Sequence, residues 1–178
     1  RIHAHMMRSE AFMRFPVQGN VLDALDDGRL TVGKHTLFEP GCWITIADSG
    51  RVEIGEGCFL NMGTMVAAQD RVTIGDHTMF ANHCFVSDAS HRYDDPNLPV
   101  TWQGFTSKGP TRIGSNCWFG IGCVVTTGVT IGDRCVVGAN SVVTRDLPPG
   151  VIAAGAPAKV IRQIDFGAGE DATRLATS

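Results

Sequence analysis

One histidine lies where the sequence changes character, and its position suggests acid–base chemistry. His91 ends a regular stretch and is followed directly by Arg92–Arg112, a segment rich in Pro, Gly and Asp. Ordered domains seldom carry a structureless loop longer than about 12–15 residues unless that loop has a function. An imidazole can remove a proton near neutral pH, and a hydroxyl group is a weak nucleophile until its proton is taken. We therefore predict that His91 is a general base that activates a hydroxyl acceptor.

The sequence on both sides of this segment has a period of six residues. An apolar residue recurs at each sixth position, usually with Gly after it and a small residue four places on. The longest uninterrupted series is Ile113, Phe119, Val125, Ile131, Val137 and Val143. One apolar residue in six cannot close a core within its own unit, but copies stacked about 4.8 Å apart can. The repeat therefore predicts a parallel β-helix in which Gly provides the backbone freedom for frequent corners.

Three units make one triangular coil, so the coils can be counted. Before His91 the apolar positions form the triplets Val32, Phe38 and Ile44, then Ile54, Leu60 and Val66, then Ile74, Phe80 and Val86. Two further coils cover the chain from Ile113 to Pro148. We therefore predict an all-β fold of about five coils over residues 29–164, interrupted by an excursion loop at 92–112 and followed by a short C-terminal segment.

Two terminal segments lie outside the repeat. Residues 1–28 form a non-repeat segment, in which Arg8–Phe15 is predicted as a short helix packed over the first coil. Residues 165–178, rich in Gly, Ala and Thr, are predicted to be a flexible tail.

All six cysteines occupy the small position of a repeat unit. They are Cys42, Cys58, Cys84, Cys117, Cys123 and Cys135. A free cysteine behaves as a small apolar residue in a core, so this placement favours core filling over disulfides or a metal site. Reduced cysteines also favour a reducing compartment, and we predict a cytoplasmic protein.

The charge balance argues against polyanionic partners. The chain has 15 basic and 18 acidic residues, a formal net charge of −3. This balance predicts neither nucleic-acid binding nor attraction to an anionic membrane. No apolar run approaches the roughly 18 residues that span a bilayer, so membrane insertion is not expected either.

Five ordered motifs carry a resemblance to a known family. They are Ser87–His91, Ile113–Gly120, Gly128–Gly132, Val137–Asp146 and Ala154–Arg162. Together they resemble the hexapeptide-repeat acyltransferases, and most of all the galactoside, maltose and nodulation-type acetyltransferases and the polysaccharide O-acetyltransferases. The resemblance implies a left-handed β-helix and a homotrimer with sites between subunits. It also implies direct acetyl transfer from acetyl-coenzyme A to a small hydroxylated acceptor such as a sugar, without a required metal.

The resemblance also implies roles for individual residues. His91 corresponds to the catalytic base, and Asn61 and Asn82 correspond to acceptor-binding positions. The coenzyme-binding positions are Trp118, Gly120, Ile121, Ala139, Thr144, Arg145, Lys159 and Arg162. Asn61 could instead be a corner residue that tolerates a positive φ angle. One family aspartate implicated in substrate binding corresponds to Gln69, so contacts to the acceptor are expected to differ here.

Two other classes of protein use the same fold. A γ-class carbonic anhydrase would hold zinc through three histidines at a subunit interface, and His77, His83 and His91 are the candidates here. The family's pair of histidines five residues apart is absent from this sequence. A non-catalytic β-helix scaffold is the other alternative, and it predicts no binding of coenzyme A.

Overall fold

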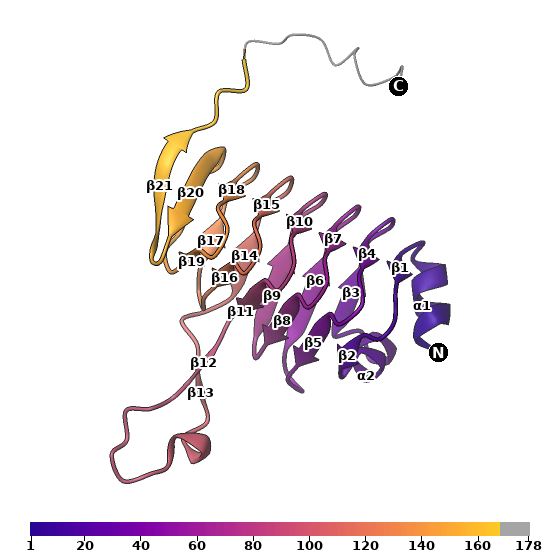
Figure 1. Cartoon of the computed structure of the whole chain (residues 1–178). Helices are drawn as coiled ribbons and strands as arrows, with labels where there is room; N and C mark the ends of the chain where they lie inside the picture. The colour runs from indigo at the N-terminus through magenta and orange to yellow at the C-terminus, as the bar shows by residue number, and fades with distance from the viewer. Residues whose placement is uncertain (168–178) are drawn as a thin grey trace, which may run out of the picture.

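Short strands joined by sharp corners form a left-handed parallel β-helix (Figure 1). The computed structural model describes residues 1–167. Five coils contain three strands each, as the six-residue period predicts. The strands are β3–β5 (Leu30–Val32, Leu37–Phe38, Trp43–Ile46), β6–β8 (Arg51–Ile54, Phe59–Leu60, Met65–Ala68), β9–β11 (Arg71–Ile74, Met79–Phe80, Phe85–Ser87), β14–β16 (Thr111–Ile113, Trp118–Phe119, Val124–Val125) and β17–β19 (Thr130–Ile131, Val136–Val137, Val142–Val143).

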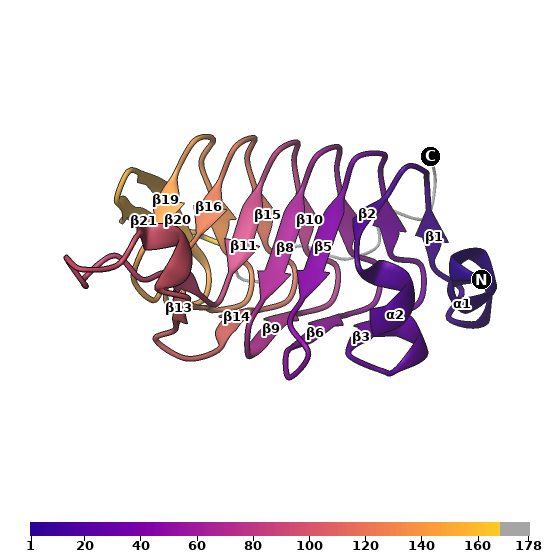
Figure 2. The ribbon, with the colours of Figure 1, turned by 90° about the horizontal axis from the view of Figure 1, so that it is seen from below.

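The strands stack into three parallel sheets, which are the three faces of the helix (Figure 2). Face A is the eight-stranded sheet that contains β4, β7, β10, β15 and β18. Face B is the six-stranded sheet with β5, β8, β11, β16 and β19, and face C is the five-stranded sheet with β3, β6, β9, β14 and β17. The chain turns from face A to face B at the A–B corner, and from face B to face C at the B–C corner.

The predicted apolar positions form the core. Phe38, Leu60, Phe80, Phe119 and Val137 are stacked in register inside face A, each at most 1% exposed. The rings of Phe80 and Phe119 stack with centroids 4.7 Å apart. These two residues lie on either side of the 92–112 loop in the sequence, so the core continues without interruption from the third coil to the fourth.

The small position of each unit does more than fill space. The Cys84 Sγ donates to the Gly120 carbonyl at 3.2 Å, and the Thr78 hydroxyl donates to the Gly114 carbonyl at 2.8 Å. Cysteine and threonine side chains at this position thus both donate to a carbonyl of the next coil. All six cysteines are free and at most 2% exposed, so the prediction of buried, unpaired thiols is confirmed.

Thiol titration should find these cysteines unreactive in the native protein. All six thiols are at most 2% exposed, so a reagent reaches them only when the coils open. Burial also raises the pKa of the Cys42 thiol to about 11 and raises the pKa of the Cys58 thiol. We expect slow labelling at pH 8 and rapid labelling of all six groups after unfolding, when the reactive thiolates become accessible. Rapid labelling of several thiols in the native state would show that the repeat register is wrong.

The N-terminal segment differs from the prediction. The helix α1 spans Ile2–Arg8, and the predicted helix at Arg8–Phe15 is wrong. Residues 12 and 13 form β1 (Phe12–Met13), which pairs with β4 and extends face A, because the first full coil would otherwise expose its strand edge. The strand β2 (Gln18–Gly19) extends face B in the same way, and α2 (Val21–Asp26) follows it.

The C-terminal segment folds back on the last coil. The strand β20 (Val151–Gly155) continues face A beside β18, and β21 (Ala158–Gln163) pairs with it antiparallel. The guanidinium of Arg134 lies 5.6 Å from the centre of the Phe166 ring. Most of the predicted tail lies outside the described residues.

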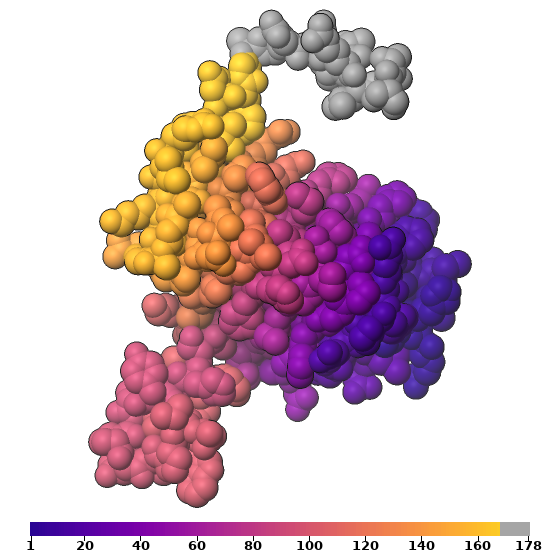
Figure 3. All heavy atoms as spheres, viewed as in Figure 1, coloured from indigo at the N-terminus to yellow at the C-terminus, as the bar shows by residue number. Residues whose placement is uncertain are grey.

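The excursion loop is an arm that stands away from the coils (Figure 3). Its stem is an antiparallel pair, β12 (Ser90–His91) with β13 (Phe105–Thr106), and a 3-10 turn at Val100–Trp102 lies near its far end. The Gln103 amide nitrogen donates to the carbonyls of Asp95 and Leu98, which orders the tip. The arm is therefore a folded element with a fixed base at the B–C corner.

Neither α1, with seven residues, nor α2, with six, approaches the length needed to cross a bilayer, and no other helix of residues 1–167 does.

Candidate functional site

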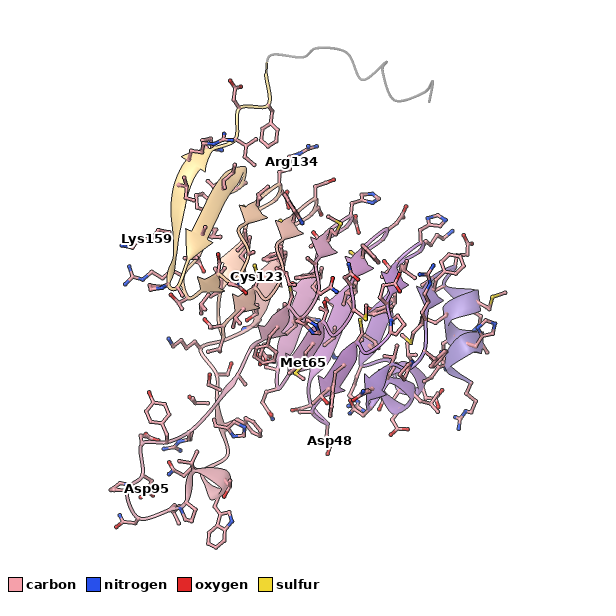
Figure 4. The ribbon with its side chains drawn as sticks, in the orientation of Figure 1. Asp48, Met65, Asp95, Cys123, Arg134 and Lys159 are labelled. Carbon is pink, nitrogen blue, oxygen red and sulfur yellow. The ribbon has the colours of Figure 1, made fainter. Side chains whose placement is uncertain are left out.

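His91 lies at the mouth of a cavity between face B and the stem of the arm. Its ring packs against Phe105, with ring centroids 4.5 Å apart and planes tilted by 35°. The cavity has a volume of about 420 Å³ and is also lined by Met65, Phe85 and Gln69. Figure 4 shows Met65 on the coils and Asp95 at the far end of the arm. Within residues 1–167 the His91 ring makes no hydrogen bond, so its nitrogens are free to meet a ligand.

A buried carboxylate fixes the backbone around this cavity. Asp88 is 0% exposed, and its side chain accepts hydrogen bonds from the backbone amides of Gln69, Asp70 and Arg71 at 2.8, 2.7 and 2.5 Å. Its own carbonyl accepts a hydrogen bond from Ser107 at 2.6 Å. Asp88 thus joins the preceding coil to the returning strand of the arm.

Sequence reasoning did not identify Asp88 or Phe105 as parts of the site. Asp88 belongs to the Ser87–His91 motif, and this membership was the one sequence feature that could have identified it. Its hydrogen-bond partners are backbone amides, which any residue type provides, so the sequence does not reveal them. Phe105 belongs to a segment without a repeat, and only the pairing of β12 with β13 places it opposite His91.

Five of the predicted site residues gather at the A–B corner. They are Asn61, Asn82, Gly120, Ile121 and Ala139. The Asn82 carbonyl accepts from Gly122, and the Ile121 carbonyl accepts from Asn140, so Asn82, Ile121 and Ala139 form one column across successive coils. Within the part of the chain that the structure describes, the backbone amide of Ile121 donates no hydrogen bond to a protein acceptor.

Two of these residues have a local explanation that bears on their predicted roles. A Cβ atom on Gly120 would lie 2.6 Å from the Ala139 nitrogen, so glycine is required here for the stacking of one coil on the next. Asn61 does not have a positive φ angle. The local explanation for asparagine is instead its side-chain oxygen, which accepts a hydrogen bond from the Met62 amide at 2.8 Å.

The remaining predicted residues lie on other surfaces. Trp118 is on the outer side of face A and is 49% exposed. Thr144 and Arg145 follow β19 at the B–C corner, on the same side as His91 but two coils further on. Lys159 and Arg162 are exposed on β21, where Figure 4 labels Lys159. Within residues 1–167 neither of these two cations forms an ion pair.

One chain therefore does not bring the predicted site together. His91 lies at the carboxyl ends of the face B strands, whereas Asn61 and Ile121 lie at the corner from which those strands start. The cavity lining includes His91 and none of the other predicted site residues.

The three histidines considered for zinc are not gathered. His77 and His83 lie at different corners, both at positive φ. No group of three or more His, Cys, Asp or Glu side chains placed to hold a metal ion occurs in residues 1–167.

Comparisons with known proteins agree with the fold and with the sequence motifs. A family model described as the hexapeptide repeat of succinyl-transferase matches residues 110–145. Galactoside O-acetyltransferase of Escherichia coli (strain K12) is 36% identical over 135 residues, which cover 76% of this chain and 64% of that protein. A putative acetyltransferase of Staphylococcus aureus (strain COL) is 56% identical over 63 residues, and the match spans only 32% of its length.

A solved structure covers more of both chains. The hexapeptide-repeat-containing acetyltransferase of Vibrio cholerae O1 biovar eltor, complexed with acetyl-coenzyme A, superposes with a TM-score of 0.67 and 31% identity. The match covers 80% of this chain and 76% of that one. The motifs, the coil architecture and these relatives show that the chain belongs to the hexapeptide-repeat acyltransferase family.

Proposed function

We propose that the protein transfers an acetyl group from acetyl-coenzyme A to a hydroxyl of a small acceptor, with His91 as the general base. The observation that carries the proposal is the unpaired His91 ring at the mouth of a cavity large enough for a small molecule. The Vibrio cholerae relative was solved with acetyl-coenzyme A, which supports the choice of donor. The Escherichia coli relative acts on galactosides by name, which supports a saccharide acceptor.

The reaction is a direct displacement at the thioester carbon. The acceptor hydroxyl gives its proton to a nitrogen of His91 while its oxygen bonds to the thioester carbon. The amide of Ile121 is a donor for the negative charge that develops on the carbonyl oxygen. The carbon–sulfur bond then breaks, and the thiolate takes the proton back from the imidazolium. A cysteine acyl-enzyme is not part of the mechanism, because all six thiols are buried in the coils.

Self-assembly completes the site in this proposal. The outer side of face A carries one continuous row of apolar side chains: Phe12, Leu37, Phe59, Met79, Trp118, Val136 and Ile152. The corresponding row of face C is polar, with Thr31, Glu53, Thr73, Arg112 and Thr130. An apolar row of this length is typical of an interface. Because Asn61 and His91 lie at different corners of the coils within one chain, the proposal places Asn61 of one subunit beside His91 of the next in a three-fold ring.

Mixed assemblies test the shared site. Asn61→Ala and His91→Ala should each lower turnover strongly, but subunits of the two kinds unfolded and refolded together should recover activity. Random mixing in equal amounts restores about a quarter of the sites in a cyclic trimer, because one interface in each mixed ring has both native residues. No recovery, with mixed trimers verified by mass, would show that both residues act within one subunit.

Lys159 and Arg162 are proposed to hold the phosphates of the coenzyme. Lys159→Ala and Arg162→Ala should each weaken binding of coenzyme A by about tenfold, because a cation paired with phosphate is worth roughly 1.4 kcal/mol or more. Binding of pantetheine, which lacks those phosphates, should be unchanged. Lys34→Ala, at the opposite end of the β-helix, is the matched control. Equal weakening of both ligands would contradict this placement.

Calorimetric titration with coenzyme A, followed by a screen of hydroxylated acceptors, tests the proposal as a whole. We expect saturable binding and acceptor-dependent release of the thiol. A protein that binds no coenzyme A would be a scaffold and not an enzyme of this class.

A further inference from the structure

The stem of the arm holds an aromatic ring against the imidazole of His91. Phe105 faces His91 directly across the antiparallel pair of β12 and β13. The Arg92 amide donates to the Gly104 carbonyl at 3.0 Å just beyond this pair. His91 and Phe105 are therefore a pair without direct backbone hydrogen bonds, the type whose side chains come closest. Their ring centroids are 4.5 Å apart, with planes tilted by 35°.

The stem is clamped to the coils close to this pair. The Ser107 hydroxyl donates to the Asp88 carbonyl at 2.6 Å, and the Thr127 hydroxyl donates to the same carbonyl. The Lys108 amide in turn donates to the Thr127 hydroxyl at 2.9 Å. Asp88 lies three residues before His91, and Ser107 lies two residues after Phe105. Both strands of the stem are thus fixed to the coils, and the contact between the two rings is part of the fold before a ligand binds.

Packing, and not hydrogen bonding, orients the imidazole within one chain. Across residues 1–167 the ring nitrogens of His91 form neither a hydrogen bond nor an ion pair. In many sites the second nitrogen of a working histidine is held by a hydrogen bond to a carbonyl or carboxylate. Here the neighbour is a hydrocarbon ring, and both residues line the same cavity. Phe105 can therefore restrict the ring of His91 while leaving its nitrogens free for the acceptor hydroxyl.

We propose that Phe105 is a positioning residue, which holds the His91 ring and stabilises the imidazolium that forms during transfer. The inference rests on the proposed function, because that cation arises only if His91 takes the acceptor proton. A cation within about 6 Å of the centre of an aromatic ring is attracted by the electrons of the ring. The neutral imidazole gains less, so the contact strengthens as the proton is transferred. An interaction of this kind raises kcat and not the affinity for the substrate.

Steady-state kinetics of Phe105→Leu and Phe105→Tyr tests the inference, with the acceptor identified in the screen. Leucine keeps an apolar side chain without an aromatic face, so kcat should fall by about three- to thirtyfold. KM for the acceptor and the affinity for coenzyme A should stay within about twofold. Tyrosine keeps the ring and should retain at least about half of the wild-type kcat.

Trp102→Leu is the matched control on the same arm. Trp102 is 75% exposed in the 3-10 turn near the far end, so its loss should leave kcat unchanged. An equal loss of kcat in Trp102→Leu would overturn the inference, because the arm would then act as a whole. A loss in Phe105→Tyr as large as in Phe105→Leu would overturn it too, as would a rise in KM with kcat unchanged.

Two further measurements ask whether Phe105 acts through His91. In the His91→Ala protein, Phe105→Leu should lower the remaining rate by less than about twofold, because its partner is absent. In NMR spectra of the coenzyme-free protein, the ring proton signals of His91 are identified by their absence from His91→Ala. These signals should move in Phe105→Leu, which removes the aromatic ring current, and stay in place in Trp102→Leu. Full additivity of the two substitutions, or unmoved His91 signals, would overturn the inference. Full turnover by His91→Ala would instead count against the proposed function.

Discussion

Replacing His91 with alanine should lower turnover by about 10²–10⁴, the usual contribution of a general base. His91 is exposed, and its ring packs against Phe105 of the arm and not in the core of the coils, so the variant should fold normally. The proposed coenzyme-binding residues lie on other parts of the chain, so the affinity for coenzyme A should stay within about twofold of the wild type. The measurement is steady-state thiol release with a true acceptor, combined with calorimetry for coenzyme A.

His3→Ala is the matched control for this variant. His3 is an exposed residue within α1, where alanine is well tolerated, and turnover should be unchanged. If His91→Ala kept more than about a tenth of wild-type turnover, His91 would not be the base.

Asp88→Asn should have the largest effect on stability. The carboxylate of Asp88 is fully buried and accepts three backbone hydrogen bonds. An amide keeps one acceptor oxygen and turns an NH₂ group toward amides that are themselves donors. We expect the free energy of unfolding to fall by about 3–5 kcal/mol, as when a buried charged group loses its partners. Turnover should fall as well, because Asp88 holds both Gln69 and the base of the arm.

Asp133→Asn provides the comparison. The Asp133 side chain accepts a single backbone hydrogen bond, from the Ser115 amide at 2.7 Å, and the residue is exposed at its corner. Loss of this hydrogen bond should lower the free energy of unfolding by about 1 kcal/mol or less. Denaturant unfolding at one fixed protein concentration measures both variants, so that any self-association affects them equally. A loss for Asp88→Asn no larger than for Asp133→Asn would show that the buried carboxylate does not organise this corner.

The coils were predictable because each buried position is repeated. Phe80 and Phe119 share a place in the six-residue unit, and this alone aligns two strands that the arm separates in sequence. The segment at Phe12–Met13 was not predictable in this way. It becomes a strand because β4, far along the chain, offers an unpaired edge, whereas local propensity favoured a helix.

The site was predictable only in part. His91 could be recognised from its position beside a long insertion, but the cavity depends on Phe105, whose path is set by the stem pairing of the arm. The resemblance identified Asn61 and Ile121 as candidate site residues. That they lie at a different corner of the coils from His91 became apparent only from the folded chain. Sequence spacing alone does not indicate that these residues lie at different corners of the coils.

The most direct test of acetyl transfer follows both products of one reaction. Acetyl-coenzyme A and a saccharide acceptor identified in the screen are incubated with the wild-type protein and with His91→Ala. Free thiol is measured by absorbance with a chromogenic thiol reagent, and the acetyl ester is measured by mass spectrometry. We predict one ester formed for each thiol released, at a rate about 100-fold or more above that of the variant. Thiol release without ester, or equal rates for the two proteins, would contradict general-base transfer by His91.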